Sequence, residues 1–342
     1  MKIVKNITIF AALGMVVIGV IMIVGAFASA KFDFKNLIKT VNYEEKTYDI
    51  TEDFSSIDMQ IDSQNIWIER SDDENAHFVC YECDSEWFEV SVQNDTLVID
   101  NQQYDHLTIM VNYEMGDHST LYLPKDVYEN LKVKDGSGDM VADKDTFTFE
   151  DVDVNIGSGD VMLAGLTADD LVLYSGSGNL KVESVNAGSA DFKTETGDIS
   201  IRDCSVDNFV NSKTGSGNVD CSQVSCNSVN FHVGSGDITV NSISCASDLE
   251  TVTSSGDISL TDAVSETGFN ASTGSGDITL NACDAGEMEL KTGSGDITGT
   301  LKSAMKFDAN SGSGAIRVPA DGNGGNCSVK TGSGDIDLSI AE

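Results

Sequence analysis

The fold is decided by the segment Phe269-Asn-Ala-Ser-Thr-Gly-Ser-Gly-Asp-Ile-Thr-Leu280, because variants of it recur along most of the chain. We number each copy from the residue that follows its Ser-Gly or Thr-Gly pair, which is Asp277 in this copy. These origins are Asp139, Asp160, Asn179, Asp198, Asn218, Asp237, Asp257, Asp277, Asp296, Ala315 and Asp335, at spacings of 19 to 21 residues. Self-similarity at a fixed period of this length is the sequence signature of a solenoid.

Apolar residues alternate with polar residues on both sides of each glycine turn. The residue after the origin is Ile, Val, Leu or Met in all eleven copies, and an apolar pair such as Phe269 and Ala271 precedes the turn. Alternation with period two predicts strands with one buried face. The sequence therefore predicts an all-β fold: a β-solenoid, or β-helix-like stack, of coils of about 20 residues over residues 134–342.

Residues 47–133 are also rich in alternating apolar residues but lack the repeat. A solenoid needs covered ends, since an open edge pairs with other chains. We expect residues 47–133 to form irregular starting coils that cap one end. Residues 31–46 are expected to form a short polar stalk.

The N-terminus predicts a membrane segment within residues 1–30. Lys2 and Lys5 precede an apolar run from Ile7 to Ala28, which is long enough to cross a bilayer as a helix. Basic residues before the run place the N-terminus inside the cell. We expect a single-pass cell-membrane protein with an extracellular C-terminal domain, or a secreted protein if cleavage follows Ala30.

The charge balance restricts the partners. The chain of 342 residues carries 20 Lys and Arg against 56 Asp and Glu, a formal charge of −36. Such an excess opposes nucleic-acid binding because phosphates would be repelled. It favours solubility, association with cations, or basic partners.

Two further segments carry a resemblance. Leu121-Tyr-Leu-Pro-Lys leads through residues 126–135 to the first Gly-Ser-Gly-Asp139 turn, and Phe54-Ser-Ser-Ile-Asp-Met59 is a matching opening strand. With the repeats, residues 48–340 resemble the bacterial putative-adhesin family of unknown function. The resemblance implies a membrane-anchored β-solenoid on the surface of Gram-positive bacteria, and no catalytic residues.

Aspartate dominates the repeat origins and suggests a calcium ladder. Stacked carboxylates about 5 Å apart repel each other, and Ca²⁺ between coils would relieve that repulsion. The alternative is turn capping, in which the carboxylate accepts nearby backbone N–H groups. The candidate ligands are Asp139, Asp160, Asp198, Asp237, Asp257, Asp277, Asp296 and Asp335.

The eight cysteines suit structural roles. Cys226 and Cys245 share one repeat offset in successive coils, so a disulfide between them is an open alternative to two free thiols. Cys80 and Cys83 form a C-x-x-C motif, but it lies in a predicted strand and has no second pair for zinc. The core residues are expected to include Cys204, Cys221, Cys283 and Cys327.

Threonine and lysine recur just before the turns. If both faced outward, they would form a stripe able to touch a glycan or cell-wall polymer. The alternative is that they are ordinary strand residues without a ligand, with lysine deterring lateral pairing between chains. The residues are Thr194, Thr214, Thr273, Thr292, Thr331, Lys193, Lys213, Lys291 and Lys330.

The function expected from these patterns is a non-enzymatic extracellular binding scaffold for a cell-envelope polymer, a glycan or a protein ligand. The alternative is a structural or sensory envelope component without a soluble ligand. A polysaccharide-active enzyme is less favoured, because the coils vary too little in length to build a cleft from long loops. The glycine turns also lack the lysine of a P-loop, so no cofactor is expected.

Overall fold

The computed structural model describes residues 38–39, 42–103, 109–110, 118–143, 145–320 and 322–341. The predicted membrane segment, residues 1–30, lies outside this part of the chain. Among the described residues, no helix has the length and hydropathy needed to cross a bilayer.

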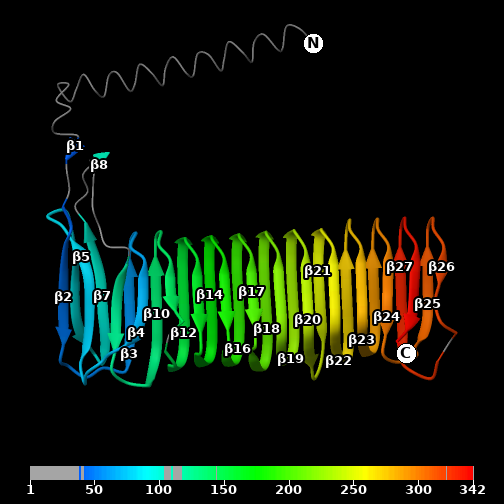
Figure 1. Ribbon diagram of the computed structural model, residues 1–342, viewed down its shortest axis with the longest axis horizontal. Helices are drawn as coiled ribbons and strands as arrows, with labels where there is room; N and C mark the ends of the chain where they lie inside the picture. Colours follow the sequence, from blue (N-terminus) through cyan, green and yellow to red (C-terminus); the bar gives the residue numbers. More distant parts are fainter. Residues whose placement is uncertain are drawn as a thin grey trace, which may run out of the picture.

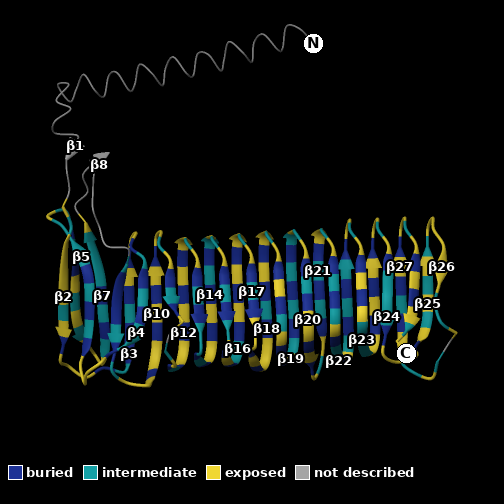
Figure 2. Ribbon diagram, in the orientation of Figure 1, coloured by how far each residue is buried: buried dark blue, intermediate teal, exposed yellow. Residues whose placement is uncertain are grey.

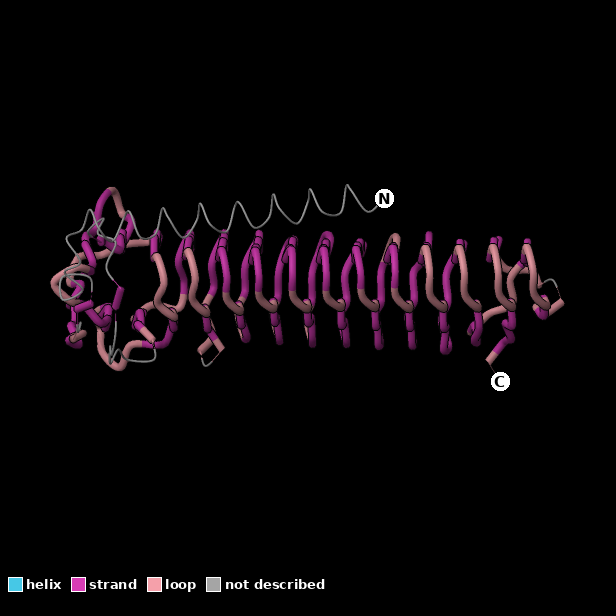
Figure 3. The backbone as a smooth tube through the Cα atoms, turned by 90° about the horizontal axis from the view of Figure 1, so that it is seen from above, coloured by secondary structure: helices cyan, strands magenta, loops and turns pink. Residues whose placement is uncertain are grey.

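The described chain is an all-β solenoid, as predicted. Each coil contributes one strand segment before its glycine turn and one after it, so the rod has two long faces, which we call the first face and the second face (Figures 1 and 3). The first face is built by β10 (Val127–Asp135), β12 (Thr148–Ser158), β14 (Thr167–Ser177), β16 (Asn186–Thr196), β18 (Ser205–Ser216), β21 (Leu249–Ser255), β27 (Asn326–Thr331) and β25 (Lys306–Ser311). The second face is built by β11 (Met140–Ala142), β13 (Val161–Ala164), β15 (Leu180–Glu183), β17 (Ile199–Arg202), β20 (Ile238–Cys245), β24 (Ile297–Leu301), β28 (Ile336–Ile340) and β26 (Ile316–Arg317). The longer strands β19 (Val219–Ser235), β22 (Ile258–Thr273) and β23 (Ile278–Thr292) begin on the second face and continue into the first face of the next coil.

Parallel pairing between coils aligns equivalent residues in columns. Leu173 of β14 lies beside Phe192 of β16, and Val182 of β15 lies beside Ile201 of β17. All four side chains are buried, which confirms the apolar pairs predicted around each turn. Figure 2 shows the result as bands of buried and exposed residues that run along the rod.

The second glycine of each turn has a steric reason. Gly197 has φ +150, which L side chains rarely adopt, and a Cβ at this position would lie 2.1 Å from the carbonyl oxygen of Gly178 in the preceding coil. The coil backbones can therefore approach closely only because this side chain is missing.

In seven successive coils a second corner also has positive φ but is seldom glycine. Its φ values lie between 51 and 68 degrees at Gly165, Ser184, Asp203, Gln223, Ser242, Asp262 and Ala282. Regular stacking holds residues such as Gln223 and Ala282 in the left-handed region, which most L side chains disfavour.

Antiparallel strands cover the N-terminal end of the rod. The coil of β3 (Ser56–Ile61) and β4 (Ile66–Arg70) stacks in parallel on β10 and β11. Beyond it, β2 (Glu44–Ile50) pairs antiparallel with β5 (Ala76–Glu82), and β6 (Glu86–Gln93) pairs antiparallel with β7 (Thr96–Gln103). β5 also pairs antiparallel with β9 (Ser119–Leu123), whereas the two-residue strands β1 (Ile38–Lys39) and β8 (Ile109–Met110) form a separate sheet.

The last two coils do not follow the order of the chain. β27 and β28, at the C-terminus, pair with β23 and β24 on one side and with β25 and β26 on the other. The coil of residues 306–317 is therefore the outermost one, and the C-terminal coil is inserted behind it (Figure 1). This order departs from the sequential stacking that the repeat suggests.

Candidate binding surface

The residues at the repeat origins form a ladder of hydrogen bonds between coils. In each coil except the outermost one, the side-chain Oδ1 of the origin accepts the backbone N–H of the origin in the next coil, at 2.7 to 2.9 Å. Asn179 and Asn218 serve as well as aspartate, because an amide oxygen accepts equally. The origin side chains therefore accept backbone N–H groups, as the turn-capping alternative supposes, but each accepted N–H belongs to the neighbouring coil.

The ladder has a beginning and an end that the repeat did not reveal. It begins at Asn65, whose Oδ1 accepts the N–H of Asp139 at 2.9 Å. It ends at Ala315, which donates to Asp335 and has no side-chain acceptor of its own. Ala315 belongs to the outermost coil, so it terminates the ladder instead of interrupting it. In the sequence, Asn65 resembles a repeat origin only because Ile66 follows it, since the glycines of the turn are missing before it.

The structure leaves the calcium ladder untested. The Oδ1 atoms of the ladder aspartates already accept backbone N–H groups. Across the described ranges, no group of three or more His, Cys, Asp or Glu side chains is arranged to share a metal ion. Calcium at the eight aspartates remains a prediction for solution experiments.

The threonines before the turns face inward, so the part of the predicted stripe that depends on them is wrong. Thr194 is 1% exposed, and its hydroxyl donates to the carbonyl of Gly178 in the preceding coil at 3.0 Å. The same bond, at 2.8 to 3.0 Å, is made by Ser175, Thr194, Thr214, Thr253, Thr273, Thr292, Thr331 and Ser311. We call this internal column the hydroxyl ladder. Its hydroxyls satisfy partly buried glycine carbonyls, which would otherwise cost free energy.

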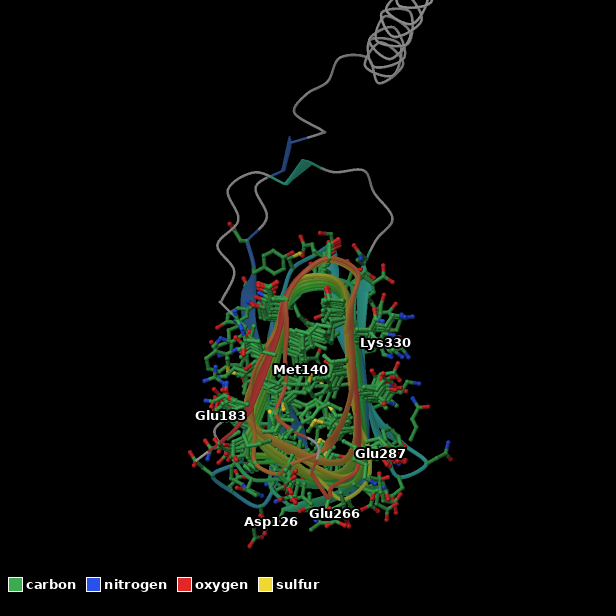
Figure 4. All side chains as sticks on the ribbon, turned by 90° about the vertical axis from the view of Figure 1, so that its right-hand side faces the viewer. Asp126, Met140, Glu183, Glu266, Glu287 and Lys330 are labelled. Atoms are coloured by element: carbon green, nitrogen blue, oxygen red, sulfur yellow. The ribbon has the colours of Figure 1, made fainter. Side chains whose placement is uncertain are left out.

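The lysines of the predicted stripe do face outward, on the first face. Tyr174, Lys193, Lys213 and His232 lie side by side in four successive coils, and Lys291 lies beside Lys330 further along the same column. The ammonium of Lys193 lies 5.1 Å from the centre of the Tyr174 ring. We call these residues the lysine column. In the end-on view, Lys330 projects from this face and Glu183 from the opposite one, whereas Met140 lies inside (Figure 4).

The surroundings of the lysine column are flat and rich in hydrogen-bonding groups. On one side lies a column with many glycines, such as Gly176, Gly215 and Gly234. On the other side Asp191, Asn211 and Asn230 occupy consecutive coils. The first face therefore offers ammonium, amide and phenol groups in adjacent columns.

The cysteines lie mainly in the core. Cys204, Cys221, Cys283 and Cys327 are buried, which confirms the prediction for these four residues. The Sγ atoms of Cys226 and Cys245 lie 3.6 Å apart on register-paired strands, and both residues are free thiols here. A disulfide between them remains a prediction.

The C-x-x-C pair has no redox geometry. Cys80 is buried in β5, and burial raises the pKa of its thiol to about 12. A thiol with so high a pKa is protonated and a poor nucleophile at neutral pH. Cys83 lies outside the strand, with its Sγ 3.4 Å from the hydroxyl of Ser85.

The cap contains an open pocket of about 360 Å³ near Phe54, Lys125 and Tyr128. Its one basic group is already engaged, because the Lys125 ammonium pairs with Asp53 and donates to the carbonyl of Phe54 at 2.9 Å. The pocket lining contains Thr51, Glu52 and Glu74 but neither a histidine nor a cysteine. Nothing in this lining forms a nucleophile–base pair.

Solved structures with a similar fold share little sequence with this chain. A putative adhesin from Bacteroides fragilis is 17% identical, with a TM-score of 0.37 over 87% of this chain and 97% of its own. A putative adhesin from Parabacteroides distasonis is 11% identical, with a TM-score of 0.46 over 87% of this chain and 100% of its own. A putative lipid binding protein from the same species is 12% identical, with a TM-score of 0.37 over 88% and 100%.

No curated protein matches the chain. The Toastrack DUF4097 family model matches residues 54–241 and 227–342, which include the cap coil of β3 and β4 and all the repeats. The chain therefore belongs to the Toastrack DUF4097 family.

Proposed function

We propose that this protein is a non-enzymatic scaffold outside the cell whose first face binds an extended glycan or another cell-envelope polymer. The observation that carries this proposal is the lysine column, in which polar or basic side chains follow one another in four successive coils, from Tyr174 to His232. The column resumes at Lys291 and Lys330 after Val252 and Ser272. Neighbouring strands lie about 4.8 Å apart, so one coil offers one binding position and successive coils repeat it. A repetitive surface of this kind fits a repetitive ligand.

The chemistry of the column favours a glycan over a polyanion. Ammonium and amide groups donate hydrogen bonds to sugar hydroxyls, and the ring of Tyr174 offers an apolar surface to a sugar ring. Asp191 and Glu195 flank Lys193, and the whole chain carries −36, so a densely anionic polymer would be repelled. A neutral or weakly charged glycan avoids that cost.

The absence of a catalytic role is part of the proposal. The Toastrack family and the related putative adhesins suggest a non-catalytic protein. The described coils hold no metal cluster, and the cap pocket lacks a nucleophile–base pair.

The location is proposed from the N-terminal sequence. Residues 1–30 would tether the rod to the cell membrane and leave the coils outside, or would be removed after Ala30. Mass spectrometry of the mature N-terminus distinguishes the two forms. Protease treatment of intact cells should degrade the coils; coils protected until the cells are lysed would contradict an exterior location.

Binding is tested with the full chain in detergent micelles on arrays of bacterial cell-envelope glycans. Lys213→Ala removes a central donor from the column and should weaken retention several-fold. Lys181→Ala on the second face is the matched control, because it also removes one partly exposed lysine. Equal retention of both variants would contradict the assignment of the face. If no polymer is retained at all, the structural or sensory alternative is favoured.

A further inference from the structure

Phe209 lies exposed on the first face, in the middle of the rod. It belongs to β18, near the centre of the stack in Figure 1, and is 39% exposed. Among the described residues, the other exposed large apolar side chains are Val127, Val172 and Ile316, none of which is aromatic. A single exposed apolar side chain is ordinary by itself, so the surroundings of Phe209 decide whether it can serve a ligand.

An extra residue in this coil places Phe209 outside. β16 has two residues between Ala187 and Ala190, whereas β18 has three between the residues that pair with these two. The burial pattern of β18 therefore contains three exposed residues in a row, Asp207 to Phe209, where β12 and β14 have two. At this offset, nine residues before the origin, the other ten copies carry polar residues or glycine. Bulges of this kind re-aim a side chain and are frequent beside functional sites.

The neighbouring coils leave the ring of Phe209 uncovered. Phe209 pairs with Ser228 of β19, and Ser189 holds the same offset in the preceding coil. Both neighbours are small, and the Ser189 hydroxyl accepts the Nδ2 of Asn208 at 3.4 Å. None of the described residues stacks a ring or a cation on Phe209. The ring is therefore available to a ligand.

Two hydrogen-bonding groups follow Phe209 on the same outer surface of β18. Asn211 and Lys213 lie two and four residues further along the strand, and side chains at this spacing share one face. Asn211 lies beside Asp191, and Lys213 lies beside Lys193 of the lysine column. An aromatic ring with a few polar groups beside it is the usual composition of a small-ligand site.

The charges around this group nearly cancel. The charged residues of β16 and β18 are two lysines and three acids: Lys193, Lys213, Asp191, Glu195 and Asp207. The local balance of −1 contrasts with the −36 of the whole chain. An uncharged ligand therefore meets little net field here, whereas a densely charged one gains little.

We propose that Phe209 is the stacking platform for one ring of the bound glycan, a neutral β-linked sugar with equatorial hydroxyls, and that Asn211 and Lys213 bind the hydroxyls of that sugar. This inference rests on the proposed function of the first face. A sugar with equatorial hydroxyls presents C–H groups on both faces of its ring, which pack against an aromatic ring while the hydroxyls at the rim reach polar groups. An axial hydroxyl, as in mannose, interrupts one of these faces. The platform therefore adds a choice between sugars that the lysine column does not make.

Titration calorimetry of the full chain in detergent micelles tests the platform, with soluble oligosaccharides of β-linked N-acetylglucosamine as the probe. Phe209→Ala should raise the dissociation constant about tenfold. Phe209→Leu keeps apolar volume without a flat ring and should also bind more weakly, whereas Phe209→Tyr should stay within about twofold of wild type. Val127→Ala, which removes an exposed apolar side chain of β10 near the cap, is the matched control and should bind as wild type. Oligosaccharides of α-linked mannose should bind wild type about tenfold more weakly than the probe.

A fluorescence readout locates the sugar. Phe209→Trp adds a tryptophan at the platform, and its emission should shift to shorter wavelength when the probe is added. Wild type, with Trp67 and Trp87 in the cap region, is the blank and should show no shift. Circular dichroism confirms that each variant is folded.

The outcomes separate the platform from the proposed function. If Lys213→Ala weakens binding while Phe209→Ala and Phe209→Leu bind as wild type, the platform is overturned and the function of the first face stands. If wild type does not bind the probe, the platform is overturned as well, and retention of another polymer on the glycan arrays still supports the proposed function. If no glycan binds at all, both fall.

Discussion

Asp135 occupies the first repeat position of the hydroxyl ladder but cannot act as its later members do. It lies between Ile61 and Ile156 in the column that continues to Ser175 and Thr194. The carboxyl is 3% exposed, and its Oδ2 atom has no hydrogen-bond partner. Oδ1 accepts the N–H of Ser137 at 3.0 Å. We predict that Asp135→Thr stabilises the junction between the cap and the repeats.

The magnitude follows from the pKa of this carboxyl. Burial, with smaller contributions from the charges of Asp62 and Asp139, raises the pKa of Asp135 from 3.8 to about 6. A folded-state pKa above the unfolded value means that stability is lost as the pH rises from 3.8 through about 6. A shift of about two pKa units costs about 3 kcal/mol above pH 6. Threonine removes that cost and can donate to the Gln64 carbonyl, for about 1 kcal/mol more.

The assay uses the two tryptophans of the chain, Trp67 and Trp87, both of which lie in the cap region. Trp67 lies beside Val141 of the coil that follows Asp135, so tryptophan fluorescence reports local unfolding at this junction. We expect urea unfolding of Asp135→Thr and wild type to differ by about 1 to 2 kcal/mol at pH 4 and by about 4 kcal/mol at pH 7.5. Asp135→Asn is the control that removes the charge without adding the hydroxyl donor of the ladder. A difference that does not change with pH would refute the reasoning.

Four further predictions concern the ladders and the cysteines. Asp257→Ala removes the acceptor of the Asp277 amide and should cost about 1 kcal/mol in local unfolding measured by hydrogen exchange. Ala315→Asp adds a carboxylate to the outermost coil, where no further described coil donates an N–H group to it. The unfolding free energy of this variant should therefore stay within about 0.5 kcal/mol of wild type. Oxidised glutathione should link Cys226 to Cys245, visible as a joined peptide in non-reducing mass spectrometry; a persistent reaction of both thiols with iodoacetamide would contradict the link. If calcium binds the aspartate ladder, EDTA should lower the Tm of the folded chain, and an unchanged Tm would remove calcium from the account.

The sequence predicted the coil but not how the coils end. Alternation around each turn was enough to assign Leu180 and Ile199, which follow their origins, to the core, because a strand with one apolar face must bury it. The direction of Thr194 was missed, because a threonine fits either side of a strand and only the carbonyl of Gly178 decides between them. The insertion of the C-terminal coil was also not predictable. It depends on long-range pairing of β27 with both β23 and β25, and the local pattern is the same in either order.

Each coil is specified by what it offers to the next one. The carboxylate or amide at an origin receives a backbone N–H from one neighbour, and the hydroxyl before the turn donates to a glycine carbonyl of the other. A ladder of this kind has a direction, so its two ends differ. It starts at Asn65, which supplies an acceptor but lacks the glycine turn, and it ends at Ala315, which donates an N–H but supplies no side-chain acceptor. The aspartates that dominate the repeat are therefore committed to coil stacking through one oxygen each. The side chains of the lysine column are not part of either ladder, which is why we assign binding to that surface.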